Sequence, residues 1–105
     1  MSEDHKPELQ TEKDRIEKAG GFVEDNRVKG VLALSRAIGD LQYKGDKQFE
    51  LKDQMLLAIP EIRIQKFSPS IEFLIIACDG IWDCLTSEDC VNKVGELLPT
   101  KSKPS

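Results

Sequence analysis

An apolar run that ends abruptly on an aspartate constrains the fold of this chain more than any other feature. Residues 73–83 read FLIIACDGIWD. The apolar part, extended back to Ile71, predicts a strand over residues 71–78 that is buried on both faces of a sheet. Such a strand carries the Asp79 carboxylate to the rim of the sheet, where Gly80 permits a sharp turn and the close approach of a ligand.

A second carboxylate, Asp83, follows one helical turn after Asp79. If residues 79–83 form a helical turn, both acids lie on one side of it. Two carboxylates this close repel each other unless a cation neutralises them. A hard divalent ion with oxygen ligands, Mg²⁺ or Mn²⁺, would do so. The pattern therefore indicates Asp79 and Asp83 as candidate metal ligands.

Two other interpretations of these acids stay open from the residues alone. In the first, Asp79 caps the turn and Asp83 is solvated, while the neighbouring side chains only pack. In the second, Asp79 belongs to an aspartyl-phosphate enzyme of the haloacid dehalogenase type. That chemistry expects another aspartate two residues on, and Ile81 occupies that position.

The N-terminal part of the chain predicts a helix followed by a hairpin. The helix is expected over residues 4–19, with Asp4 as a cap and Gly20 at its end. Two short strands are expected on either side of residues 25–26, since Asp and Asn tolerate turn geometry. Residues 31–40 fit neither the helical nor the strand period cleanly and predict an irregular or short helical stretch.

The C-terminal part predicts a long loop, a further strand and a second helix. Residues 41–58 lack a sustained period and predict a loop of a length that is often functional. Residues 61–67 alternate between apolar and polar side chains, which predicts a half-buried strand. Thr86, with Asp89 three residues later, predicts the start of a helix. Its inward stripe would comprise Val91, Val94, Leu97 and Leu98.

Composition excludes several classes of protein. The formal net charge of −4 argues against nucleic acid or an anionic membrane as the main partner. No apolar run approaches the roughly 18 residues that a membrane helix requires. A single histidine excludes a multi-histidine metal cage. The three cysteines lack close CxxC spacing, so we expect small buried thiols in a reducing compartment.

Three more side chains are candidates for chemistry. Ser35 lacks the G-x-S-x-G context of an activated serine, so a packing role is expected. Arg27 and Arg36 have the chemistry to bind a phosphate, but by default they are expected to form structural ion pairs.

Five motifs, in this order and at this spacing, resemble the metal-dependent serine/threonine protein phosphatases of type 2C, the PPM family. They are DHKP (4–7), DRIEKAGG (14–21), RVKGVLALSRAIGD (27–40), PEI (60–62) and LIIACDGIWD (74–83). The resemblance covers about residues 3–98, which is nearly the whole chain.

The resemblance implies an α/β (α+β) fold, a four-layer α-β-β-α sandwich with antiparallel sheets, of which residues 1–105 would form an incomplete part. It implies that Mg²⁺ or Mn²⁺ activates water to hydrolyse phosphoserine or phosphothreonine in a phosphoprotein. Asp79 matches a metal-binding aspartate, and Asp83 matches a residue that supports a further, weaker metal site. About residues 41–59 match the family's flap, and residues 99–105 would be a flexible tail.

The family's catalytic domain is longer than this chain, and this difference in length bears on whether the chain alone is expected to be active. Its first metal-binding motif would lie before Met1 and its last metal-binding aspartate after Ser105. Because a catalytic metal needs several ligands, we expect the isolated chain to be inactive. The alternative is a non-catalytic phosphatase-like module with an interaction or regulatory role.

The expected surroundings of the chain follow from the same resemblance. Its partner would be a phosphoprotein substrate, with no nucleic acid and no membrane. Its location would be the cytoplasm, the nucleus or both. The substrate-binding residues and the oligomeric state are not determined by the sequence.

Overall fold

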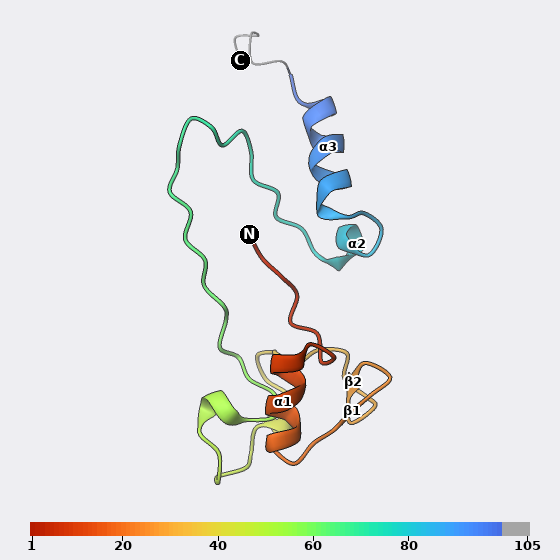
Figure 1. The fold of residues 1–105 in the computed structure, drawn as a ribbon, viewed down its shortest axis with the longest axis vertical. Coiled ribbons are helices and arrows are strands. Elements are labelled where there is room, and N and C mark those ends of the chain that lie inside the picture. Colours follow the sequence, from red (N-terminus) through yellow and green to blue (C-terminus); the bar gives the residue numbers. More distant parts are fainter. Residues whose placement is uncertain (100–105) are drawn as a thin grey trace. The chain divides into compact units, whose positions relative to one another are not determined.

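The computed structural model describes residues 1–99, which fall into two compact units (Figure 1). Unit 1 is Met1–Gln65, and unit 2 begins at Lys66. The architecture is mixed α and β, and within residues 1–99 the only sheet is a two-stranded antiparallel one. None of the helices in this part of the chain is long and apolar enough to cross a membrane. The expected tail falls almost entirely on residues 100–105, which lie outside the described residues.

Helix α1 spans Gln10–Lys18 and ends where the sequence predicts. Gly20 has a φ of +86°, its N–H donates to the Glu17 carbonyl, and the Gly21 N–H donates to the Ile16 carbonyl. These two hydrogen bonds form a Schellman motif, which satisfies carbonyls that the helix end would otherwise leave open.

The predicted start of this helix at Asp4 is wrong. Leu9 occupies the N-cap position in an extended conformation, and no side chain caps the helix. A turn precedes it, in which the Leu9 N–H donates to the Lys6 carbonyl at 3.1 Å, and Pro7 is buried there. Pro7 therefore belongs to the turn before the helix.

Strands β1 (Val23–Glu24) and β2 (Arg27–Val28) form the predicted hairpin. Asp25 and Asn26 connect them with φ values of +50° and +60°. Two central residues with positive φ make the type I′ turn whose twist matches that of paired strands. The hairpin brings Val28 into a small core with Ile16 and Met55, against which Ala19, Val23, Leu32 and Tyr43 pack.

The buried carboxylate of Glu12 ties α1 to the irregular segment that follows the hairpin. Only 1% of Glu12 is exposed, and Arg15 Nη1 and Arg36 Nε each lie 2.8 Å from its oxygens. Arg36 adds a second hydrogen bond through Nη2 at 3.0 Å. The Ser35 hydroxyl lies 2.8 Å from Glu12 Oε1 and 2.7 Å from the His5 carbonyl, and its one proton serves either acceptor.

Arg15 and Arg36 also donate hydrogen bonds to main-chain carbonyls. Arg15 donates to the carbonyls of Ser35 at 2.8 Å and Gln54 at 3.1 Å. Arg36 donates to the carbonyl of Ile59 at 3.0 Å. The ion cluster of Glu12, Arg15, Arg36 and Ser35 therefore joins α1 to both ends of the long loop.

The long predicted loop is confirmed, and it is anchored from within. It contains two short 3₁₀ turns, η1 (Leu41–Tyr43) and η2 (Leu51–Asp53). The buried Gln54 side chain donates to the carbonyls of Asp46 at 2.8 Å and Phe49 at 2.9 Å. The loop ends on the apolar residues 55–57, which are buried as well.

The strands predicted over residues 61–67 and 71–78 are absent, which corrects the prediction of a doubly buried strand. Ile64 and Phe67 are 89% and 94% exposed, and Leu74 and Ile76 are 69% and 88% exposed. No described segment pairs with either stretch, since the β1–β2 hairpin is the only sheet of residues 1–99. A strand is stable only when neighbouring strands form hydrogen bonds with its main-chain N–H and C=O groups. The period of the apolar residues alone was therefore not enough to predict a strand here.

Unit 2 contains α2 (Asp79–Trp82) and α3 (Ser87–Leu97). The predicted cap of α3 is confirmed, because the Asp89 N–H donates to Thr86 Oγ1 at 3.1 Å. The predicted inward stripe is wrong for most of its members, since Val91, Leu97 and Leu98 are exposed. Two of the thiols expected to be buried, Cys78 and Cys84, are exposed as well.

We predict that unit 1 loses stability in acid because of Glu12. Burial opposes ionisation of its carboxyl, but hydrogen bonds from Arg36, Arg15 and Ser35 outweigh it and lower the pKa from 4.5 to about 2. A carboxyl with a lowered pKa stabilises the fold above its unfolded pKa. The contribution, about 3 kcal/mol, is therefore present above pH 4.5 and lost as the pH falls toward 2.

Urea unfolding of the full chain, followed by the amide NMR signals of residues 1–65 at a series of pH values, measures this loss. Glu12→Gln removes the charge at every pH and should lower the unfolding free energy by about 3 kcal/mol at pH 7. Glu17→Gln is the control, because its ion pair with Lys13 is long, at 3.9 Å, and exposed. Equal effects of the two variants would refute the role of the ion cluster.

Replacing Gly20 or Gly95 by alanine should change the unfolding free energy in opposite directions. Neither Gly20 nor Gly95 has an atom within 4 Å of the place where a Cβ would stand, but Gly20 has a φ of +86°. Gly20→Ala should therefore destabilise unit 1 by about 1 kcal/mol through its backbone. Gly95→Ala, inside α3, should stabilise unit 2 by about 0.5–1 kcal/mol. Amide signals of each unit during thermal unfolding measure both, and a shared sign would contradict the prediction.

Candidate functional site

The two candidate metal ligands lie on one short helical turn. Asp79 is the first residue of α2, directly after Cys78 in an extended conformation. The Asp83 N–H donates to the Asp79 carbonyl at 2.8 Å, so the two residues are one turn apart along the helix axis. Both residues are exposed. The backbone thus has the helical turn that the spacing predicts, and residues four apart on such a turn lie on one side of it.

A tryptophan fixes this turn to the segment before it. Trp82 is half-buried, and its indole Nε1 donates to the Ala77 carbonyl at 2.8 Å. A Cβ at Gly80 would stand 3.5 Å from Cys78 Sγ, which is an ordinary contact, so the turn itself has room for a side chain there. The orientation of the turn therefore depends on the indole rather than on the glycine.

The donor set suits a hard divalent ion but does not complete its coordination. Carboxylate oxygens are the ligands that Mg²⁺ and Mn²⁺ prefer. Across residues 1–99, however, no group of three or more His, Cys, Asp or Glu side chains is placed to hold a metal ion. Asp79 and Asp83 can therefore supply part of a coordination sphere, with other ligands from water or from protein outside this chain.

The other sequence candidates have structural roles. Ser35 and Arg36 belong to the ion cluster, which confirms the packing role of the serine and the ion pair of Arg36. Arg27 donates to the Val31 carbonyl at 2.8 Å and so supports the hairpin through a hydrogen bond. Glu12, the one acid of the ion cluster, was not singled out from the sequence.

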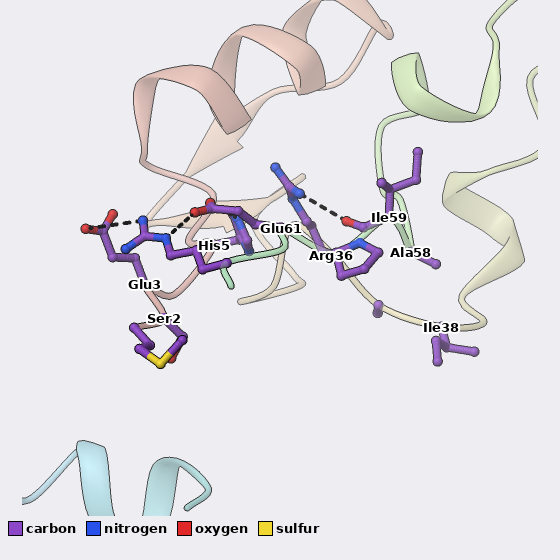
Figure 2. Close-up of a pocket in the computed structure, with 12 residues that line it drawn as sticks. Ser2, Glu3, His5, Arg36, Ile38, Ala58, Ile59 and Glu61 are labelled. Atoms are coloured by element: carbon purple, nitrogen blue, oxygen red, sulfur yellow. Dashed lines mark hydrogen bonds and ion pairs between the residues drawn. The ribbon is translucent and has the colours of Figure 1, made fainter. Parts of the chain in front are cut away.

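A hollow of about 340 Å³ lies beside the ion cluster in unit 1 (Figure 2). Figure 2 shows Arg36 directed at the Ile59 carbonyl, with His5 and Glu61 nearby. Arg63 Nε lies 2.7 Å from Glu61, which also lies 3.3 Å from His5 Nε2. Hydrogen bonding by Arg63, then its charge, lowers the pKa of Glu61. Because Arg36 and Arg63 already have acidic partners, the hollow is a weak receptor for a phosphate.

Comparison with known proteins gives one consistent family. The profile of the family described as Protein phosphatase 2C matches residues 1–104. "Probable protein phosphatase 2C 60" of Arabidopsis thaliana is 46% identical over 105 residues, which are 100% of this chain and 29% of the relative. "Protein phosphatase 2C homolog 2" of Hypocrea jecorina is 50% identical over 101 residues, 96% of this chain and 23% of the relative.

A solved structure agrees with the sequence relatives. The crystal structure of a phosphatase from a pathogenic strain of Toxoplasma gondii superposes with a TM-score of 0.55 at 51% identity. The match covers 57% of this chain and 19% of that one. The chain spans between 20% and 33% of the length of the curated relatives that it matches. Since the family profile covers nearly every residue, the chain belongs to the protein phosphatase 2C family.

Proposed function

We propose that residues 1–105 are part of the catalytic domain of a Mg²⁺- or Mn²⁺-dependent protein serine/threonine phosphatase. The observation that carries the proposal is the pair Asp79 and Asp83 on one exposed helical turn, within a chain of this family. In the proposed site Asp79 is the metal ligand, and Asp83 supports an outer metal. The proposed substrate is a phosphoprotein that carries phosphoserine or phosphothreonine.

The bound metals would neutralise phosphate charge and lower the pKa of a water molecule. The contribution of this chain is to hold two carboxylates at a fixed spacing, with the Trp82 indole restraining the turn. The remaining ligands, and the strands that complete a four-layer sandwich, are proposed to lie outside these residues. A flap role for residues 41–59 and a location in the cytoplasm or nucleus stay predictions.

A non-catalytic role is the second candidate, and one observation favours it. No three metal-ligating side chains of residues 1–99 are grouped to hold a metal ion, whereas a catalytic metal needs several ligands. We therefore expect no hydrolysis of a phosphopeptide by the 105-residue chain alone. If these residues instead form a phosphatase-like interaction or regulatory module, any longer protein that contains them would be inactive too.

A chimeric protein distinguishes the two candidates. The 105 residues replace the matching residues of the Arabidopsis relative, which are 46% identical. Hydrolysis of a phosphoserine peptide should depend on Mn²⁺ or Mg²⁺, and Asp79→Asn should lower kcat by about 100-fold or more, because a charged ligand is lost. Glu88→Gln, an exposed acid in the first turn of α3, is the matched control and should leave kcat unchanged.

Metal-dependent turnover that survives Asp79→Asn would remove Asp79 from its proposed role. A chimera that is monodisperse and helical by circular dichroism, yet hydrolyses nothing, would favour the interaction module.

A further inference from the structure

The turn that carries the two candidate ligands is too short to keep its own shape. Helix α2 comprises four residues, Asp79–Trp82, and within the described residues no side chain caps its start. Helix nucleation is unfavourable, so a single turn is marginal in water. The carboxylates of Asp79 and Asp83, four residues apart, repel each other and weaken the turn further. A contact beyond the helical hydrogen bonds is therefore needed to keep the turn formed before a metal binds.

Trp82 supplies such a contact. Its side chain is half-buried, and the indole Nε1 donates to the Ala77 carbonyl at 2.8 Å. The hydrogen bond joins the last residue of α2 to the extended segment before the helix, so Asp79 lies inside the loop of chain that the bond closes. Asp83 follows Trp82 directly, and its N–H donates to the Asp79 carbonyl at 2.8 Å.

The neighbours of Trp82 constrain the turn less than the indole does. Gly80 leaves room for a side chain, and the apolar residues Ile81 and Leu85 are 40% and 39% exposed. Apolar contacts have no preferred direction, whereas a hydrogen bond weakens steeply when its angle changes. The indole N–H, more than the bulk of the ring, therefore fixes the geometry of the turn.

We propose that Trp82 is a positioning residue for the metal site, whose indole N–H keeps Asp79 and Asp83 on one formed turn before the ion arrives. The inference rests on the proposed function, because it takes both acids as ligands. The apparent affinity for a ligand falls with the fraction of the protein that is in the binding-competent state. Loss of the indole hydrogen bond should therefore weaken metal binding although both carboxylates remain.

Two tryptophan analogues test the hydrogen bond without changing the shape of the side chain. Trp82 is the only tryptophan of the 105 residues, so an analogue supplied during expression enters one position. In benzothienylalanine a sulfur atom replaces the indole N–H, and 5-fluorotryptophan, which keeps the N–H, is the matched control. Mn²⁺ alone is titrated into the full chain, and paramagnetic broadening of the amide NMR signals of residues 79–83 gives its Kd. The sulfur analogue should raise this Kd about tenfold, and the fluorinated one should leave it unchanged.

Hydrogen exchange without metal separates positioning from a general structural role. The Asp83 amide reports on the turn, and the Cys90 amide, which donates to the Thr86 carbonyl at 3.0 Å, reports on α3. The sulfur analogue should speed exchange at Asp83 and leave exchange at Cys90 unchanged, because only the turn opens more often.

Three results would overturn the inference. An unchanged Kd with the sulfur analogue would show that the N–H does not prepare the site. Faster exchange at both amides would show that the indole supports unit 2 as a whole. Absence of Mn²⁺ broadening in the fluorinated chain would show that the turn is not ready for an ion.

Failure of the inference and failure of the proposed function are distinguishable. Turnover of the chimera that survives Asp79→Asn counts against the proposed ligand, whatever the analogues do. Metal-dependent turnover that Asp79→Asn abolishes, together with an unchanged Kd for the sulfur analogue, counts against Trp82 alone.

Discussion

The buried carboxylate of Glu12 is the interaction on which unit 1 depends. Its apolar core is small, with Ile16, Val28 and Met55 at its centre, and burial of so few side chains offsets little chain entropy. Two arginines and a serine form hydrogen bonds with Glu12. The arginines also donate hydrogen bonds to carbonyls that are distant in the sequence. Helix α1 is thereby tied to segments that no secondary structure connects.

A buried ion cluster of this kind contributes specificity more surely than net stability. Taking three charges out of water costs several kcal/mol per ion, which the mutual attraction repays only when every donor and acceptor is satisfied. Here no buried side-chain nitrogen or oxygen of residues 1–99 lacks a hydrogen-bond partner. The planar guanidinium groups of Arg15 and Arg36 match the carboxylate geometry, which a lysine would not do. The cluster thus selects one arrangement of the long loop around α1.

Sequence reasoning succeeded where structure is decided by neighbouring residues. Turn residues Asp25 and Asn26, the glycine that ends α1, and the Thr86 cap act within a few positions, and all three are confirmed. The prediction of a strand over residues 71–78 was wrong because a strand needs partner strands, which residues 1–99 do not supply. In the candidate site, the spacing of Asp79 and Asp83 was predictable for the same local reason. The role of Glu12 was not predictable, since two of its partners, Ser35 and Arg36, lie 23 and 24 residues away and its helix resembles a charged surface helix.

The uncovered segment 71–78 also has a consequence for how the chain behaves at high concentration. Residues 73–78 combine β-branched and aromatic side chains with no charge and no proline, which is the composition of segments that stack into amyloid-like fibrils. Glu72 and Asp79 border the window and oppose such stacking by charge repulsion. Stacking also requires many chains to meet, so the chain is best handled dilute.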